Sequence, residues 1–151
     1  MIGRKKPLAL VVGVLAVASL WWLIAPPRSD GRYREQAAKS AESLVSHLGT
    51  ARLWARGIAD GDATKRAATV GFYEASTDAE TTAASFESIK PPEGQTALRT
   101  AFSTVAADAV DILSRMRIAA EHGDWAQIPR ERRALIALVR RLDGFVKRAR
   151  S

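Results

Sequence analysis

The chain of 151 residues contains no cysteine, and this absence excludes several kinds of chemistry. Disulfides, thiolate nucleophiles, thiolate zinc sites, lipoprotein anchors and haem attached through C-x-x-C-H all need cysteine sulfur. The sequence also has no G-x-S-x-G elbow, no glycine-rich phosphate loop, no dinucleotide fingerprint and no Glu-x-x-His pair. It therefore predicts a protein that is not an enzyme and that holds no cofactor and no metal.

The few residues that could suggest catalysis or metal binding have simpler interpretations. His47 stands one helical turn after Ser43, but the pattern indicates neither a positioned acid nor an oxyanion hole, so we expect a surface or hydrogen-bonded histidine. Asp108 and Asp111 share a helix face and could form half of a carboxylate metal site. The spacing favours ion pairs with arginine instead, with Asp111 and Arg115 at i and i+4.

One long apolar run is present. Residues 8–25 read LALVVGVLAVASLWWLIA, follow three basic residues and precede Pro26-Pro27. At about 1.5 Å per residue a helix of this length spans roughly 27 Å, close to the thickness of a hydrocarbon core. The run predicts a single transmembrane anchor, and Trp21 and Trp22 suit the membrane–water interface at its end.

A cleavable signal peptide is the alternative interpretation of this run, because Ala16-Val17-Ala18 resembles a cleavage site. Cleavage there would leave a mature end that starts at Ser19 and is still strongly apolar, which favours an uncleaved anchor. Small residues at Ala9, Gly13 and Ala16 fall on one helix face and could pack against another membrane helix. Such patterns are also frequent by chance.

The charges around the run predict its orientation. Arg4, Lys5 and Lys6 favour a cytoplasmic N-terminus, and the arginines after the run weaken the contrast without reversing it. We expect an inner-membrane protein with a basic tail (1–7), an anchor (8–25), a linker (26–32) and a periplasmic or extracellular domain (33–151). Arginine in excess of lysine and abundant alanine are typical of a GC-rich bacterial genome.

The domain shows helical periodicity throughout and no strand-like alternation. Four segments are predicted, with apolar residues at steps of three and four, over 33–59, 63–89, 92–122 and 125–149. In the third segment these residues are Leu98, Phe102, Val105, Ala109, Ile112, Met116 and Ala119. Segments of this length with short turns predict an antiparallel four-helix bundle, so the fold class is all-α.

Local signals refine these boundaries. Gly123 is a good helix terminator and Asp124 a good N-cap for the next helix. Pro129 predicts either a distortion in the last helix or a helix that begins at Pro129. Thr77-Asp78-Ala79-Glu80 resembles a capping box, so the second segment is either one kinked helix or two short ones.

The basic residues of the domain gather in its last segment. Residues 129–151 carry 8 basic and 2 acidic side chains, a net charge of +6, whereas residues 30–128 carry 11 basic and 14 acidic, a net charge of −3. The spacing predicts a basic stripe directed away from the apolar face, formed by Arg130, Arg133, Arg140, Arg141, Lys147 and Arg148. The stripe is either a solvated face or a surface for anionic headgroups or an acidic protein.

These features favour a non-enzymatic, single-pass accessory or scaffold subunit. It would dock on a larger bacterial membrane complex, for example one of transport, secretion, respiration or photosynthesis. The alternative is an extracytoplasmic ligand-binding or sensory bundle, and a cell-envelope enzyme is a third possibility. Nucleic acid is not an expected partner, because no reader motif is present and the domain would have to lie in the cytoplasm.

Overall fold

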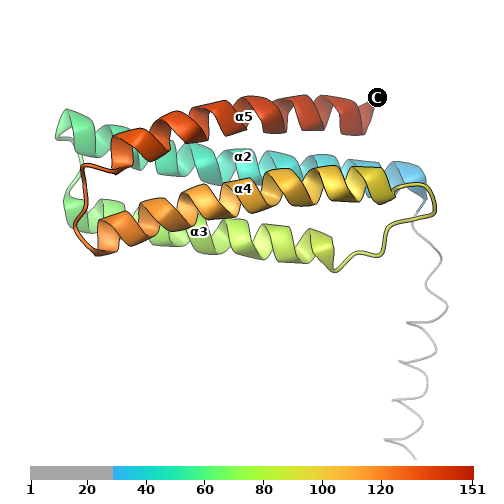
Figure 1. Ribbon diagram of the computed structural model, residues 1–151, viewed down its shortest axis with the longest axis horizontal. Helices are drawn as coiled ribbons and strands as arrows, with labels where there is room; N and C mark the ends of the chain where they lie inside the picture. Colours follow the sequence, from blue (N-terminus) through green and yellow to red (C-terminus); the bar gives the residue numbers. More distant parts are fainter. Residues whose placement is uncertain (1–28) are drawn as a thin grey trace, which may run out of the picture.

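The computed structural model describes residues 29–151, which form four α-helices joined by short loops (Figure 1). The helices are α2 (Asp30–Asp60), α3 (Lys65–Glu87), α4 (Thr96–Glu121) and α5 (Ile128–Arg150). Each helix packs on the next one in the chain, α5 packs back on α2, and α2 also contacts α4 across the centre. The predicted all-α four-helix bundle is confirmed for this part of the chain.

The two ends of the bundle differ in what they hold. The start of α2, the α3–α4 loop and the C-terminus lie at one end, which we call the C-terminal end (Figure 1). The α2–α3 and α4–α5 turns lie at the opposite end. Gly123, in the α4–α5 turn, has a φ of 74°, a conformation that glycine adopts without strain, so its predicted role in ending α4 is confirmed.

The core includes the apolar row predicted for the third segment. Phe102, Val105, Ala109, Ile112, Met116 and Ala119 of α4 are all buried, and so are Leu135, Leu138, Leu142 and Phe145 of α5. Leu98 lies at the end of the α4 row and is partly buried against the core. Apolar residues at these steps lie on one side of a helix, and burying that side is what stabilises a bundle of amphipathic helices.

Aromatic side chains join the four helices at the C-terminal end. Tyr33, Phe86, Phe102 and Phe145 come from α2, α3, α4 and α5 in that order, and all four are buried. Their ring centroids are 5.3, 4.2 and 5.8 Å apart along this series, with tilted planes. Tilted aromatic pairs at such distances add to the stabilisation from burial alone, so this cluster ties every helix to a common centre.

One predicted helix start is wrong, and the structure decides between the two alternatives for another. The third segment begins at Thr96 rather than Pro92, because Gly94 has a φ of 84° and residues 92–95 form a turn closed by the Gln95 N–H and the Pro92 carbonyl at 3.1 Å. The last helix begins at Ile128, with Pro129 in its first turn, so the structure agrees with the alternative of a helix that starts at Pro129 and not with a start at Trp125; its N-cap is Gln127 and not Asp124. Proline disfavours a helix already formed before it, which explains the later start.

The other two boundaries also differ from the sequence-based expectation. Helix α2 begins at Asp30, three residues before the predicted start at residue 33. Helix α3 is continuous from Lys65 to Glu87, and the Thr77–Glu80 signal does not start a new helix. The Glu80 carboxylate instead accepts a hydrogen bond from Ser76 at 3.3 Å, within the same helix.

The predicted anchor, residues 8–25, lies outside the described residues. So do the predicted packing residues Ala9, Gly13 and Ala16 and the interfacial Trp21 and Trp22. None of the helices in residues 29–151 combines the length and apolar character needed to cross a bilayer. The anchor and its packing face therefore stay predictions.

Candidate functional site

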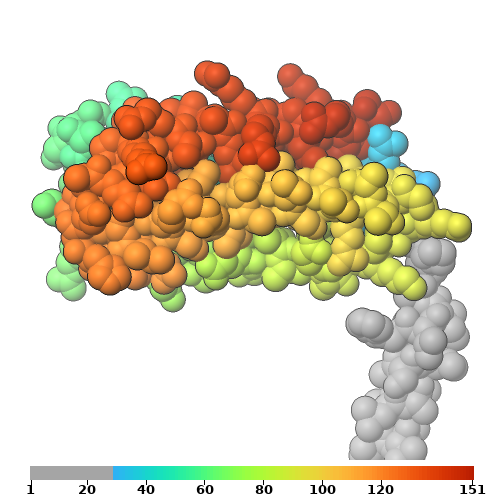
Figure 2. Space-filling view, viewed as in Figure 1, coloured from blue at the N-terminus to red at the C-terminus, as the bar shows by residue number. Residues whose placement is uncertain are grey.

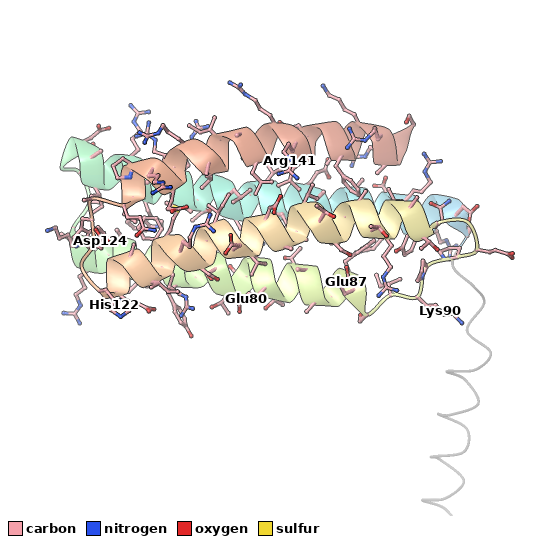
Figure 3. The ribbon with its side chains drawn as sticks, in the orientation of Figure 1. Glu80, Glu87, Lys90, His122, Asp124 and Arg141 are labelled. Carbon is pink, nitrogen blue, oxygen red and sulfur yellow. The ribbon has the colours of Figure 1, made fainter. Side chains whose placement is uncertain are left out.

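Helix α5 has one apolar side in the core and one basic side on the surface. The six residues of the predicted basic stripe are all exposed, while Leu135, Leu138 and Leu142 are buried on the other side. Long cationic side chains extend from α5 away from the other helices in Figure 3, and Figure 2 shows α5 and α4 side by side on one face. All six residues therefore lie on the exposed side of α5, away from its buried leucines.

Most cations of the basic stripe have no acidic partner within the bundle. Only Arg141 forms an ion pair, with its Nη1 2.7 Å from a carboxylate oxygen of Asp108 on α4. Within residues 29–151, no ion pair involves the remaining five, which are Arg130, Arg133, Arg140, Lys147 and Arg148. The stripe therefore carries uncompensated positive charge toward solvent.

The side of α5 that faces α2 is different, because its charges are paired. Arg150 contacts both carboxylate oxygens of Glu42, at 2.7 and 3.0 Å. The Arg34 guanidinium donates hydrogen bonds to the carbonyls of Ala149 at 3.1 Å and Arg148 at 3.3 Å, which lie in the last turn of α5. Carbonyls at the end of a helix have no partner within it, so Arg34 both caps α5 and attaches it to α2.

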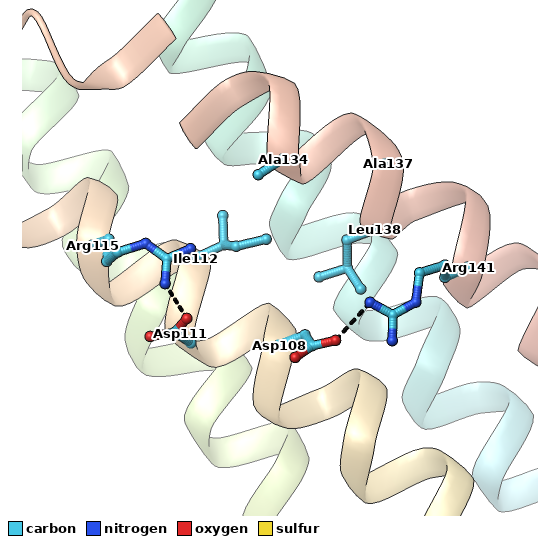
Figure 4. Close-up of a pocket in the computed structure, with 8 residues that line it drawn as sticks. All are labelled: Asp108, Asp111, Ile112, Arg115, Ala134, Ala137, Leu138 and Arg141. Carbon is cyan, nitrogen blue, oxygen red and sulfur yellow. Dashed lines mark hydrogen bonds and ion pairs between the residues drawn. The ribbon is translucent and has the colours of Figure 1, made fainter. Parts of the chain in front are cut away.

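Two hollows lie in the groove between α4 and α5. The first has a volume of about 320 Å³, and its rim holds two ion pairs, Arg141 with Asp108 and Arg115 with Asp111 (Figure 4). Its apolar lining is formed by Ile112, Ala134, Ala137 and Leu138. Because acids and bases balance at this rim, the first hollow has little net charge.

The second hollow lies nearer the C-terminal end and has a volume of about 360 Å³. Three arginines line it, and no acidic residue does: Arg140, Arg141 and Arg148 surround a surface of Ala101, Thr104, Val105 and Gly144. The lining thus combines three cations with smaller, uncharged side chains. Such a site can attract an anionic group and can also admit the backbone or side chain of another protein.

Sequence reasoning missed the buried acid of α5. Glu131 is 5% exposed, and its carboxylate accepts hydrogen bonds from Arg115 at 3.0 Å and from the side chain of Gln127 at 3.1 Å. The signal was present, because Glu131 precedes Leu135 by four residues and Leu138 by seven and so shares their helix face. This pair fixes the start of α5 against α4.

A second polar cluster joins α3 to α4 near the C-terminal end, where Figure 3 labels Glu87. The Glu87 carboxylate accepts hydrogen bonds from the Ser103 hydroxyl and from Arg99, whose Nη2 is 2.9 Å away. The Ser103 hydrogen bond is the largest cause of a pKa of Glu87 below its ordinary value, and Arg99 lowers that pKa further. The cluster is a structural link, because both partners stabilise the charged carboxylate.

The residues that resembled catalytic or metal-binding groups have structural partners. His47 Nε2 lies 3.1 Å from the Ser43 hydroxyl and 3.3 Å from the Thr82 hydroxyl, which agrees with the prediction of a hydrogen-bonded histidine. Asp108 and Asp111 pair with arginines, as predicted. Among the residues that the structure describes, no three histidine or acidic side chains gather closely enough to hold a metal ion.

The basic stripe and the adjoining α4–α5 groove are therefore the candidate site of this chain. Comparisons with protein-family models, with curated proteins and with solved structures return no match.

Proposed function

We propose that this chain is a single-pass, membrane-anchored accessory subunit that docks on a larger bacterial membrane complex through the basic stripe of α5. One observation carries the proposal: five cations on one face of α5 are exposed and without an ion-pair partner in residues 29–151. Like charges that crowd one face without partners are better explained by an acidic surface outside the chain than by stability of the bundle.

The apolar run of residues 8–25 supports the membrane part of this proposal. A partner in the membrane would keep the bundle close to its docking surface. A ligand-binding or sensory bundle has less support, because both α4–α5 hollows are open grooves, whereas small-molecule sites bury most of their ligand.

Affinity purification from the membranes of the native host tests the docking role. The variant Arg133→Gln/Arg140→Gln/Lys147→Gln removes three charges of the stripe, and Arg52→Gln/Arg66→Gln/Lys90→Gln removes the same residue types elsewhere. All six side chains are exposed and have no ion pair in residues 29–151. We expect the stripe variant to lose partners that the wild type and the control variant retain.

Two results would contradict the proposal. Equal co-purification by both variants would make the stripe a solvated face only. A mature protein that begins at Ser19, measured by intact mass, would show that the apolar run is a cleaved signal peptide and that no anchor remains.

A further inference from the structure

Gly144 is a glycine that the fold of the bundle does not require. It lies inside α5, where glycine is less favourable than alanine. A Cβ at this position would meet only Nη1 of Arg148, at an ordinary contact distance of 3.5 Å. The missing side chain therefore leaves space outside the bundle, at the floor of the second α4–α5 hollow.

Gly144 and Ala137 form a short strip of small residues on α5, with exposed cations on both sides of it. Seven residues advance a helix by about 10.5 Å and nearly two full turns, so residues at that spacing form almost straight rows. Ala137 and Gly144 follow Arg130 in the central row. One flanking row is entirely cationic, with Arg133, Arg140 and Lys147, and the row on the side of α4 has Ala134, Arg141, which pairs with Asp108, and Arg148.

We propose that the α4–α5 groove binds an acidic α-helix of the partner complex, an inference that rests on the proposed function. The small residues Ala137 and Gly144 allow a second helix to approach closely, and the unpaired cations on both sides of them, Arg140 and Lys147 on one side and Arg148 on the other, face the acidic side chains of that helix. A partner with Asp or Glu at seven-residue spacing on both sides of an apolar row matches this surface.

The surface of α5 favours a protein helix over lipid headgroups. Helices that lie on a membrane bury large apolar residues among the lipids. In the described part of the chain, the large exposed apolar residues are Leu53, Val70, Tyr73 and Ile118, and none of them is on α5. The residues between the cations of α5 are small, which suits close helix packing and gives little to insert into a bilayer.

Thiol footprinting of the full chain in nanodiscs tests this proposal. Because the chain has no cysteine, Ala137→Cys introduces a single thiol on the floor of the first hollow. The probe is a synthetic helical peptide about three heptads long, with Leu at every seventh position and Glu on both sides. Its control has Gln in place of Glu, and the measured quantity is the rate of alkylation by a maleimide.

In phosphatidylcholine nanodiscs we expect the Glu peptide to slow alkylation by about tenfold or more at saturation, and high salt to reverse the effect. The Gln peptide should have much less effect. Phosphatidylglycerol nanodiscs without peptide should leave the rate unchanged. Protection by phosphatidylglycerol but not by the Glu peptide would overturn the proposal in favour of headgroups, and no protection by either would overturn it in favour of a solvated groove.

Gly144→Leu separates helix docking from simple charge attraction, because it fills the strip and leaves every cation in place. With the same thiol, this variant should bind the Glu peptide about tenfold more weakly, whereas Gly144→Ala should bind nearly as the parent does. Unchanged helix content by circular dichroism is the control for folding. Equal binding by Gly144→Leu and the parent would overturn the proposal.

The same variants separate this proposal from the docking role. If the Arg133/Arg140/Lys147 variant loses its native partners but Gly144→Leu keeps them, docking through the basic stripe stands and the groove is not the contact. If neither variant loses partners, the docking role itself fails.

Discussion

The α2–α3 and α4–α5 interfaces join helices of similar length but are filled differently. Between α2 and α3, the indole of Trp54 occupies the space beside Gly71, and a Cβ on Gly71 would overlap it. Between α4 and α5, a Cβ on Gly144 would meet only the end of the Arg148 side chain, at an ordinary contact distance, and the space opens into a hollow lined by three arginines. The packing of Trp54 thus explains why residue 71 is a glycine, whereas no contact within the bundle explains why residue 144 is one.

This difference shows where the chain has space that its own packing does not use. Trp54, Ser43, His47 and Thr82 fill the α2–α3 interface with a ring and three mutually hydrogen-bonded groups. The α4–α5 interface is held by the Arg115–Glu131 and Arg141–Asp108 pairs, with the two hollows beside them. An interface that is closed by its own side chains stabilises the fold, whereas an open one can receive another molecule.

The difference between the two interfaces should disappear at the C-terminal end, because the aromatic cluster fills the space between all four helices there. Phe102 is fully buried against Phe86 and Phe145, so Phe102→Ala should lower the free energy of unfolding by about 3–5 kcal/mol. Urea denaturation followed by circular dichroism measures this loss. A loss below about 1 kcal/mol would contradict the burial of Phe102.

Gly71→Ala tests the closed interface directly. The added methyl group overlaps Trp54, so we expect the free energy of unfolding to fall by about 1–3 kcal/mol despite the better helix propensity of alanine. The same substitution in a Trp54→Ala background should be much less harmful, because the overlap is gone. Equal effects in the two backgrounds would show that Trp54 does not occupy this space.

Gly144→Ala is the matched test of the open interface, and its effect should have the opposite sign. The methyl group meets only the end of the Arg148 side chain, so the variant should gain up to about 1 kcal/mol from helix propensity. Thermal unfolding of the two Gly→Ala variants side by side measures the contrast. Destabilisation by Gly144→Ala would indicate an internal role for this glycine.

The smallest expected effect concerns the α3–α4 link at Glu87. Because its folded-state pKa is lowered, Glu87 contributes stability above the unfolded carboxyl pKa of about 4.3, and this contribution disappears as pH falls through the lowered value. Ser103→Ala should move the Glu87 pKa upward, toward its ordinary range. A carboxyl NMR titration measures it, and an unchanged pKa would contradict the role of Ser103.

The bundle and its core follow from the sequence because burial imposes a helical period on the apolar residues. Phe102 and Leu138 could be placed in the core for this reason alone. The start of α4 could not be predicted in this way, because the positive φ of Gly94 depends on how the loop closes against Pro92. Tyr33 is buried beside Phe86, a contact between α2 and α3 that helical spacing alone does not predict.

The candidate site was predictable only in part. Residues at seven-residue spacing, such as Arg133 and Arg140, fall on one face of any straight helix, so the stripe needed no structure. The hollows could not be predicted from the sequence, because they lie between α4 and α5. Their lining depends on which residues of α4, such as Ala101 and Val105, stand opposite Gly144. The pairing of Arg141 with Asp108 depends on the same alignment.

The attachment of the last turn of α5 to the start of α2 has a mechanical consequence. These two helices are antiparallel neighbours, and Arg34 and Arg150 join them at the end of the bundle that holds residue 29 and Ser151. A force that pulls residue 29 away from Ser151 would load these contacts first and then peel the helices apart one turn at a time. A force applied between residue 29 and the α4–α5 turn would instead load the whole α2–α5 interface in shear, so the bundle should resist pulling far better along its length than at its joined ends.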